Sequence, residues 1–191
     1  EEKPIIVRSN FDGNLQSYRS GNLNQNNQKL DSGYGIVVIN ADGVSEIENT
    51  IFHRMSAPNQ LSGLGLLGSI NFYQSDVRIK NSKFSENIIG DDYLNIIRSN
   101  FVIKNCIFQD VNSDAIDIDF SKGIMSKLDF RDTGNDALDF SGSDVELKDI
   151  VVYGAGDKAI SIGEKSKISI EDISVFDSNI GLASKDNSNV N

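Results

Sequence analysis

Residues that cross-link or interrupt a chain are scarce in this 191-residue sequence. It contains one cysteine, Cys106, two prolines and no tryptophan. A single cysteine excludes an intrachain disulfide, and we expect its thiol to be buried as a small apolar group. So few prolines leave most strands free of residues that lack a backbone donor. Sixteen glycines, together with many Asn, Asp and Ser residues, indicate frequent turns.

The charge balance limits the class of partner. The chain has 18 Lys and Arg against 28 Asp and Glu, so its formal net charge is -10. This excess of negative charge argues against nucleic acid or an anionic membrane as the main partner, because phosphates are repelled. No segment approaches the roughly 20 apolar residues of a membrane span. The opening EEKPIIV is no signal peptide and is typical of a mature or excised fragment.

A repeat of 22 residues organises the second half of the chain. The segments DDYLNII, SDAIDID, NDALDFS, DKAISIG and NIGLASK each begin 22 residues after the one before, at Asp91, Ser113, Asn135, Asp157 and Asn179. Apolar and polar residues alternate within them, which is typical of a strand with one buried face. A unit this short cannot bury that face alone, so successive units must stack.

Parallel stacking places like residues in columns. One inward column comprises Leu94, Ile116, Leu138, Ile160 and Leu182. A second comprises Phe52, Phe84, Phe108, Phe130, Val152 and Val175. A turn column comprises Asn49, Asn81, Asn105, Asp149 and Asp172, residue types that tolerate left-handed turn conformations. We therefore predict an all-β fold: a right-handed parallel β-helix, a single solenoid with coils of about 22 residues and an Asn/Asp turn ladder.

The repeat also predicts the domain organisation. Residues 35–191 form the β-helix, with an insertion at 53–69, and the polar residues 1–34 form an N-terminal flank or long loop. Solenoids need polar caps. Neither end of the repeat has an amphipathic cap, so we expect neighbouring parts of a larger protein to cover both ends.

Outward positions on the regular strands form the candidate site. One column runs Asp92, Asp114, Asp136 and Lys158. The next runs Asn95, Asp117, Asp139 and Ser161, and Lys185 lies at the far edge. Carboxylates one coil apart repel each other. This repulsion is relieved by a raised pKa, by a bound cation or by solvation.

Three interpretations of these columns remain open. In the first, the residues are solvated groups that keep a sheet face soluble. Paired carboxylates also suit acid–base chemistry on a sugar, with Asp114, Asp136 and Lys158 catalytic and Asp117, Asp139, Asn95 and Lys185 binding substrate. Oxygen ligands from adjacent coils suit Ca²⁺, with Asp114, Asp117, Asp136 and Asp139 as ligands. No other cofactor is implied. Tyr73, Tyr93 and Tyr153 are candidates to stack on sugar rings or to pack at coil edges.

The repeats resemble a known group. GNDALDFSGS, GDKAISIGEKS and NIGLASKDNS are similar to the repeats of bacterial right-handed parallel β-helix proteins of the pectin-lyase-like fold, over residues 35–191. Polygalacturonase-type glycoside hydrolases of this fold carry the motifs N-T-D, D-D, G-H-G and R-x-K on successive coils. That likeness would place Asp114 in the first motif and Asn135 and Asp136 in the second. Lys158 would replace the histidine, and Ala183 and Lys185 would occupy the last motif. The changed positions imply a related scaffold with altered or lost hydrolysis.

These observations lead to three functional expectations. The first is an extracellular or cell-surface β-helix module that binds or presents to a polysaccharide or cell-surface glycan, as part of a larger protein. The second is a polysaccharide hydrolase, lyase or uronate epimerase that uses the ladder of Asp114, Asp136 and Lys158. The third is a purely structural spacer.

Overall fold

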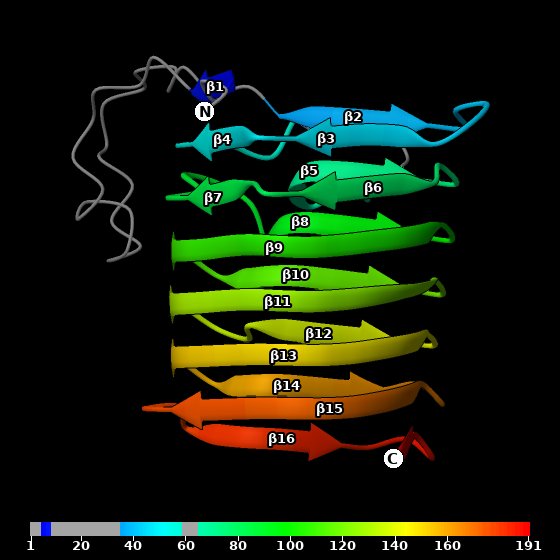
Figure 1. Ribbon diagram of the computed structural model, residues 1–191, viewed down its shortest axis with the longest axis vertical. Helices are drawn as coiled ribbons and strands as arrows, with labels where there is room; N and C mark the ends of the chain where they lie inside the picture. Colours follow the sequence, from blue (N-terminus) through cyan, green and yellow to red (C-terminus); the bar gives the residue numbers. More distant parts are fainter. Residues whose placement is uncertain (1–4, 9–34, 59–64) are drawn as a thin grey trace.

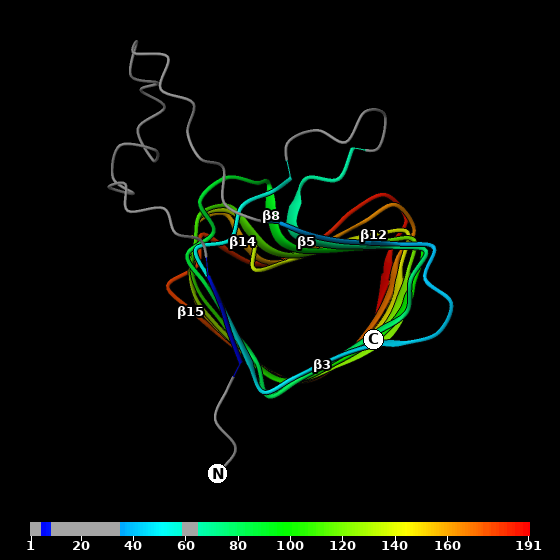
Figure 2. The ribbon, with the colours of Figure 1, turned by 90° about the horizontal axis from the view of Figure 1, so that it is seen from above.

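The protein is a right-handed parallel β-helix, as the repeat predicts. The computed structural model describes residues 5–8, 35–58 and 65–191. Every named element in these ranges is a strand, and all the strand pairs are parallel; no helix there is long and apolar enough to cross a membrane. Figure 1 shows the coils stacked along the long axis, and Figure 2 shows the three-sided cross-section that they share.

The strands belong to two sheets. Sheet A has ten strands: β1 (Ile5–Arg8), β3 (Ser45–Glu48), β4 (Thr50–His53), β6 (Val77–Lys80), β7 (Lys83–Ser85), β9 (Asn100–Val111), β11 (Lys122–Thr133), β13 (Asp144–Ala155), β15 (Lys167–Phe176) and β17 (Asn189–Val190). Sheet B has seven: β2 (Ile36–Ile39), β5 (Gly68–Tyr73), β8 (Asp92–Ile97), β10 (Asp114–Asp119), β12 (Leu138–Ser141), β14 (Lys158–Gly163) and β16 (Ile180–Ser184).

The segments predicted to lie outside the regular coils are described only in part. Of the predicted flank 1–34, the structure describes Ile5–Arg8, which forms β1 and pairs with β4. The rest of that flank lies outside the described residues, as do residues 59–64 of the predicted insertion. At the start of the insertion, the backbone N–H of Ala57 donates to the carbonyl of Ile89 at 2.6 Å. This bond ties the insertion to the turn that precedes β8.

The turn ladder is confirmed by its backbone geometry. Asn49, Asn81, Asn105, Asp149 and Asp172 all have positive φ, between 51° and 56°. The amide of Asn105 donates to Asn81 Oδ1 at 2.8 Å, so the side chains also bond from coil to coil. Two further positive-φ columns mark the other corners, one with Gln74, Arg98, Phe120 and Gly142 and one with Glu86, Asp110, Asp132 and Gly154. Three such corners in each coil produce the triangular outline.

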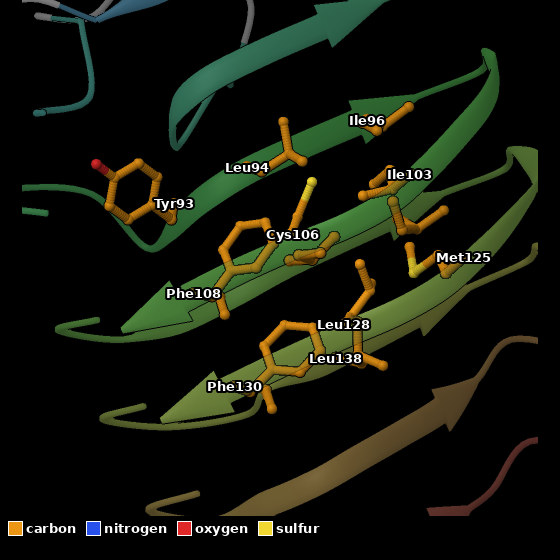
Figure 3. Packing of buried hydrophobic residues seen from close by; sticks show 14 of the residues in the cluster. Tyr93, Leu94, Ile96, Ile103, Cys106, Phe108, Met125, Leu128, Phe130 and Leu138 are labelled. Atoms are coloured by element: carbon orange, nitrogen blue, oxygen red, sulfur yellow. The ribbon is translucent and has the colours of Figure 1, made fainter. Parts of the chain in front are cut away.

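The predicted aromatic column forms the centre of the core. The ring centroid of Phe84 lies 5.0 Å from that of Phe52 and 4.5 Å from that of Phe108. The centroids of Phe108 and Phe130 lie 5.2 Å apart. Figure 3 shows Phe108 and Phe130 packed beside Cys106 and the leucines of sheet B. Cys106 is buried, as predicted. Stacked coils thus supply the apolar partners that one coil lacks.

A serine ladder lines the corner between sheet B and sheet A. In each coil, a backbone N–H donates to the serine hydroxyl of the next coil at 2.8–3.2 Å; the serines are Ser75, Ser99, Ser121, Ser143, Ser166 and Ser188. The hydroxyl of Ser121 donates in turn to the carbonyl of Asp119 at 2.8 Å. The ladder therefore pairs buried backbone groups where the strand pairing is interrupted.

Candidate functional site

The outward face of sheet B carries the columns predicted from the repeat. In the strand register, Asn95 lies beside Asp117, Asp117 beside Asp139, and Asp139 beside Ser161. The apolar residues on either side of them point into the core. Since successive side chains of a strand alternate between faces, these four point outward in one row. Asp117 and Asp139 are partly exposed, whereas Asn95 and Ser161 are buried.

Glycine turns place the strands of this face tightly on one another. A Cβ atom at Gly134 would lie 2.1 Å from the carbonyl oxygen of Asn112, and one at Gly156 would lie 2.2 Å from the carbonyl oxygen of Gly134. No side chain fits in that space, so only glycine allows the turns to stack here. Each of these glycines stands two residues before a ladder residue, Asp136 or Lys158. The close stacking of these turns therefore sets the spacing between Asp136 and Lys158 along the axis of the solenoid.

Asp114 and Asp136 bind backbone of the next coil. Asp114 Oδ1 accepts the backbone N–H of Asp136 at 2.8 Å and the side-chain amide of Asn135 at 2.7 Å. Asp136 Oδ1 accepts the backbone N–H of Lys158 at 2.9 Å. Both carboxyl groups are buried. Each one thus fixes the start of the following strand, a structural task that the sequence did not suggest for these predicted catalytic residues.

Lys158 is held between two carboxylates. Its Nζ lies 3.3 Å from Asp136 Oδ1 and also contacts Asp157 Oδ2. The hydrogen bond to Asp157 is the main cause that raises the pKa of Lys158, and the lysine in turn lowers the pKa of Asp157. The ammonium group is therefore neutralised within the turn. Lys185 follows β16 on an exposed turn, where its backbone N–H donates to the carbonyl of Ile162 at 2.8 Å. Within the described part of the chain, no hydrogen bond or ion pair joins its side chain to Asp117 or Asp139.

Asn95 bridges two carboxyl groups of neighbouring coils. Its side-chain amide donates to Asp92 Oδ2 at 3.1 Å and to Asp117 Oδ2 at 2.7 Å. Asp92 is 3% exposed and Asn95 4% exposed. The two N–H groups of one amide are thereby both used on carboxyl oxygens. We call Asp92, Asn95 and Asp117 the carboxyl bridge.

Both carboxyl groups of the carboxyl bridge have raised pKa values. Burial is the main cause that raises the pKa of both Asp92 and Asp117 far above the usual range for aspartate, and the charges of neighbouring carboxylates raise it further. Such a pair titrates as one unit. Burial also raises the pKa of Asp114 to about 6, although its two hydrogen bonds oppose the shift. The face therefore holds three carboxyl groups with raised pKa values, those of Asp92, Asp114 and Asp117, on two neighbouring strands.

A calcium site at these residues has no support from the geometry. Among the residues that the structure describes, no group of three or more His, Cys, Asp and Glu side chains is arranged to hold a metal ion. The predicted ligands Asp114 and Asp136 direct an oxygen at backbone N–H groups instead. The raised pKa values give the alternative way of relieving carboxylate repulsion. The Ca²⁺ site stays a prediction.

The three tyrosines proposed for sugar stacking lie in different surroundings. Tyr93 is fully buried, with its ring edge on Phe84 and its hydroxyl donating to the carbonyl of Ser85 at 3.1 Å. Tyr153 is exposed on sheet A, where Phe176 covers one face of its ring at 4.4 Å. Tyr73 is the last residue of β5 in sheet B, and its hydroxyl accepts a 3.4 Å bond from Arg98. Of these three tyrosines, Tyr73 is the one that is partly exposed on sheet B.

Asp92 of the predicted column and Asp119 also belong to this face, although neither was given a catalytic or substrate-binding role. Asp119 pairs in register with Ser141, next to Asp117 along its strand, and burial raises its pKa. Both residues recur at ladder positions in the sequence, so the repeat did contain a signal. What it could not supply is the burial of Asp92, which depends on how the turns pack above the strand.

Comparison with known proteins identifies no relative of this chain. No family model, no curated protein and no solved structure matches this chain. The structure bears out the solenoid that the resemblance implied, and no match supports the pectin-lyase-like or polygalacturonase assignment. The chain is therefore placed by its fold alone, as a right-handed parallel β-helix.

Proposed function

We propose that the outward face of sheet B binds polysaccharide and that the protein is an extracellular or cell-surface β-helix module within a larger protein. The observation that carries this proposal is the registered row of Asn95, Asp117 and Asp139 on adjacent strands. A carboxyl group that keeps its proton can both donate to and accept from a sugar hydroxyl, and an ionised carboxylate accepts. A row of such groups suits a hydroxyl-rich chain that lies across the coils.

Rigidity supports this proposal. The row stands on strands whose starts are fixed by Asp114 and Asp136 and whose turns are closed by stacked glycines. Sites on strands are held more precisely than sites on loops. A preorganised surface loses little conformational entropy on binding. Partial exposure of Asp117 and Asp139 leaves their oxygens within reach of a ligand.

A glycan array tests the proposal. We expect binding by the wild type, and loss of that binding when Asp117→Asn is combined with Asp139→Asn. Asp144→Asn is the matched control, because Asp144 is an exposed aspartate of sheet A. Binding should survive Asp114→Asn with Asp136→Asn, since an asparagine Oδ1 still accepts the backbone N–H. Wild-type protein that binds no glycan on the array would contradict the proposal.

The carboxyl bridge favours a second candidate, a polysaccharide-active enzyme. A general acid must hold its proton near the working pH, and burial raises the pKa of Asp117 in that direction. Asp117 is partly exposed, so it is the first candidate for the acid; the predicted set of Asp114, Asp136 and Lys158 is the second. Each of that set already has bonds within the turns.

Incubation with pectin, alginate and glycosaminoglycans separates the candidates. New reducing ends, or absorbance of an unsaturated product, that disappear with Asp117→Asn and persist with Asp144→Asn would favour the enzyme. Binding without turnover would favour the module. If the protein neither binds nor turns over any of these polymers, and every substitution in the row is tolerated, the structural spacer is the interpretation that remains.

Covering partners at the ends of the solenoid remain part of the proposal. In the last coil, Ile180 is 39% exposed and Leu182 41% exposed. Leu182 continues the inward column that is fully buried in the coils before it. Apolar groups in such positions gain stability when a further coil or partner covers them.

A further inference from the structure

Sheet A carries a band of positive charge although the molecule is acidic. Lys80 of β6 and Lys104 of β9 lie side by side in the strand register. Lys83 follows beyond the corner at Asn81, and Lys127 occupies the equivalent corner two coils later. Lys80, Lys104 and Lys127 are exposed and Lys83 is half-buried. We call these four residues the lysine band.

Within the described residues, the lysine band is not neutralised by ion pairs. Four other basic residues of sheet A do have carboxylate partners: Arg78 with Glu46 at 3.2 Å, Lys122 with Asp144 at 3.3 Å, Arg131 with Asp129 at 2.5 Å and Lys148 with Glu171 at 2.7 Å. No ion pair joins any member of the band to a carboxylate in this part of the chain. Like charges on neighbouring strands repel each other, so an anionic ligand would relieve that repulsion.

The band is narrow along the axis of the solenoid. On one side, Glu48 lies beside Lys80 in the register and accepts a 3.3 Å bond from the Asn81 amide. On the other side, Asp149 occupies the next corner position after Lys127. The band is therefore confined to three coils with carboxylates at both limits. A ligand that runs parallel to the strands can contact the lysines and avoid those carboxylates.

The convex corner suits a slender polymer chain better than a flat membrane as the ligand. Figure 2 shows that sheet A bends sharply at its corner, so a flat surface cannot touch both flanks together. A lipid bilayer would also bring its headgroups against the flanking carboxylates. Single-stranded nucleic acid is held by aromatic platforms, and the exposed aromatics among the described residues, Phe120, Tyr153 and Phe176, lie outside the band. A slender polyanion without stacking bases fits these constraints best.

We propose that the lysine band binds a linear anionic polysaccharide, whose sulfate or carboxylate groups pair with Lys80, Lys83, Lys104 and Lys127. The chain runs along the strands and across the corner. This surface is separate from the row on sheet B, so either site can exist without the other. Since these lysines are exposed, the affinity falls steeply as salt screens the charges.

Calorimetry with dextran sulfate, polygalacturonate and neutral dextran tests this proposal. We expect a sulfated or carboxylated chain to bind at low salt, and neutral dextran not to bind. Replacing Lys80, Lys83 and Lys104 by glutamine should weaken binding by at least about tenfold. The control replaces Lys122, Lys165 and Lys167 by glutamine, which changes the net charge equally and should weaken binding by less than about twofold.

The arms of the experiment also decide between ligands. Preference for dextran sulfate identifies sulfate as the recognised group, and preference for polygalacturonate identifies carboxylate. The proposal is overturned if neither polymer binds, or if both triple variants lose affinity equally. It is also overturned if phosphatidylserine vesicles or an oligonucleotide bind more tightly than either polysaccharide. Circular dichroism should give the same spectrum for both variants, because the substituted side chains are at the surface.

Discussion

Replacing Asp117 with asparagine should stabilise the protein at neutral pH. Asparagine keeps an acceptor for the 2.7 Å bond from Asn95 but cannot ionise. Burial, followed by the charges of Asp92 and Asp119, raises the pKa of Asp117. In the unfolded chain an aspartate pKa is about 3.9. Above that value the unfolded chain has lost a proton that the folded protein keeps. Wild-type stability therefore falls as pH rises from about 4 through the raised pKa.

The size of the effect follows from this proton difference. One proton is worth about 1.4 kcal/mol of unfolding free energy for each pH unit. Between about pH 5 and pH 7 the upper bound is therefore about 3 kcal/mol. Because Asp92 and Asp117 influence each other's titration and Asp117 is partly exposed, we expect about 1–3 kcal/mol. The Asp117→Asn variant should gain this amount over the wild type between the two pH values.

Urea unfolding at about pH 5, 6, 7 and 8 measures this gain. Asp144→Asn serves as the control, since Asp144 is exposed and forms a surface ion pair with Lys122 at 3.3 Å. The difference between Asp117→Asn and the wild type should grow with pH, whereas the control difference stays within about 0.5 kcal/mol. A difference for Asp117→Asn that is constant over the whole range would refute the reasoning.

Three further substitutions test how the coils are held together. Phe108→Ala removes a ring stacked on Phe84 and Phe130 and should lower the free energy of unfolding by about 3–5 kcal/mol in urea, against less than about 1 kcal/mol for the exposed Phe176→Ala. Gly134→Ala should destabilise strongly, because its Cβ would lie 2.1 Å from a backbone oxygen, whereas Gly181→Ala meets no atom within 4 Å and should have little effect; equal thermal midpoints would contradict this. Ser121→Ala leaves the buried N–H of Ser99 without its acceptor and should cost about 1–3 kcal/mol, with faster hydrogen exchange at the Ser99 amide; unchanged exchange there would count against the serine ladder.

The repeat made the fold predictable. The 22-residue spacing aligned Phe84, Phe108 and Phe130 in one inward column, and the rings do stack. It also placed asparagines at one corner, where Asn81 and Asn105 adopt positive φ. Both features depend on residue type and spacing alone, which the sequence contains directly.

Features that depend on the contact between coils were missed. The serines of the ladder recur at the coil period, but their role appears only when the N–H of one coil meets the hydroxyl of the next. Lys127 occupies a left-handed corner position where the pattern suggests Asn or Asp, because the coils around it fix the backbone there. The Ca²⁺ site and the likeness to the polygalacturonase motifs stay predictions.

The same limit explains the candidate site. Alternation predicted that Asp114, Asp117 and Asp136 point away from the core. It could not reveal that Asp114 and Asp136 accept backbone N–H groups of the following coil. Nor could it reveal that one amide, Asn95, joins two carboxyls, since the burial that raises their pKa values comes from the packing of the turns.

Amide chemical-shift mapping with a glycan tests the central claim most directly. The protein would be titrated with the oligosaccharide that gives the strongest array signal, and shifts would be followed in the ¹⁵N spectrum. We predict the largest shifts at Asn95, Asp117 and Asp139 and their strand neighbours, with β11 and β13 unchanged if the ligand is neutral. Shifts confined to sheet A, or no shifts at any glycan concentration, would contradict the account of sheet B as the binding face.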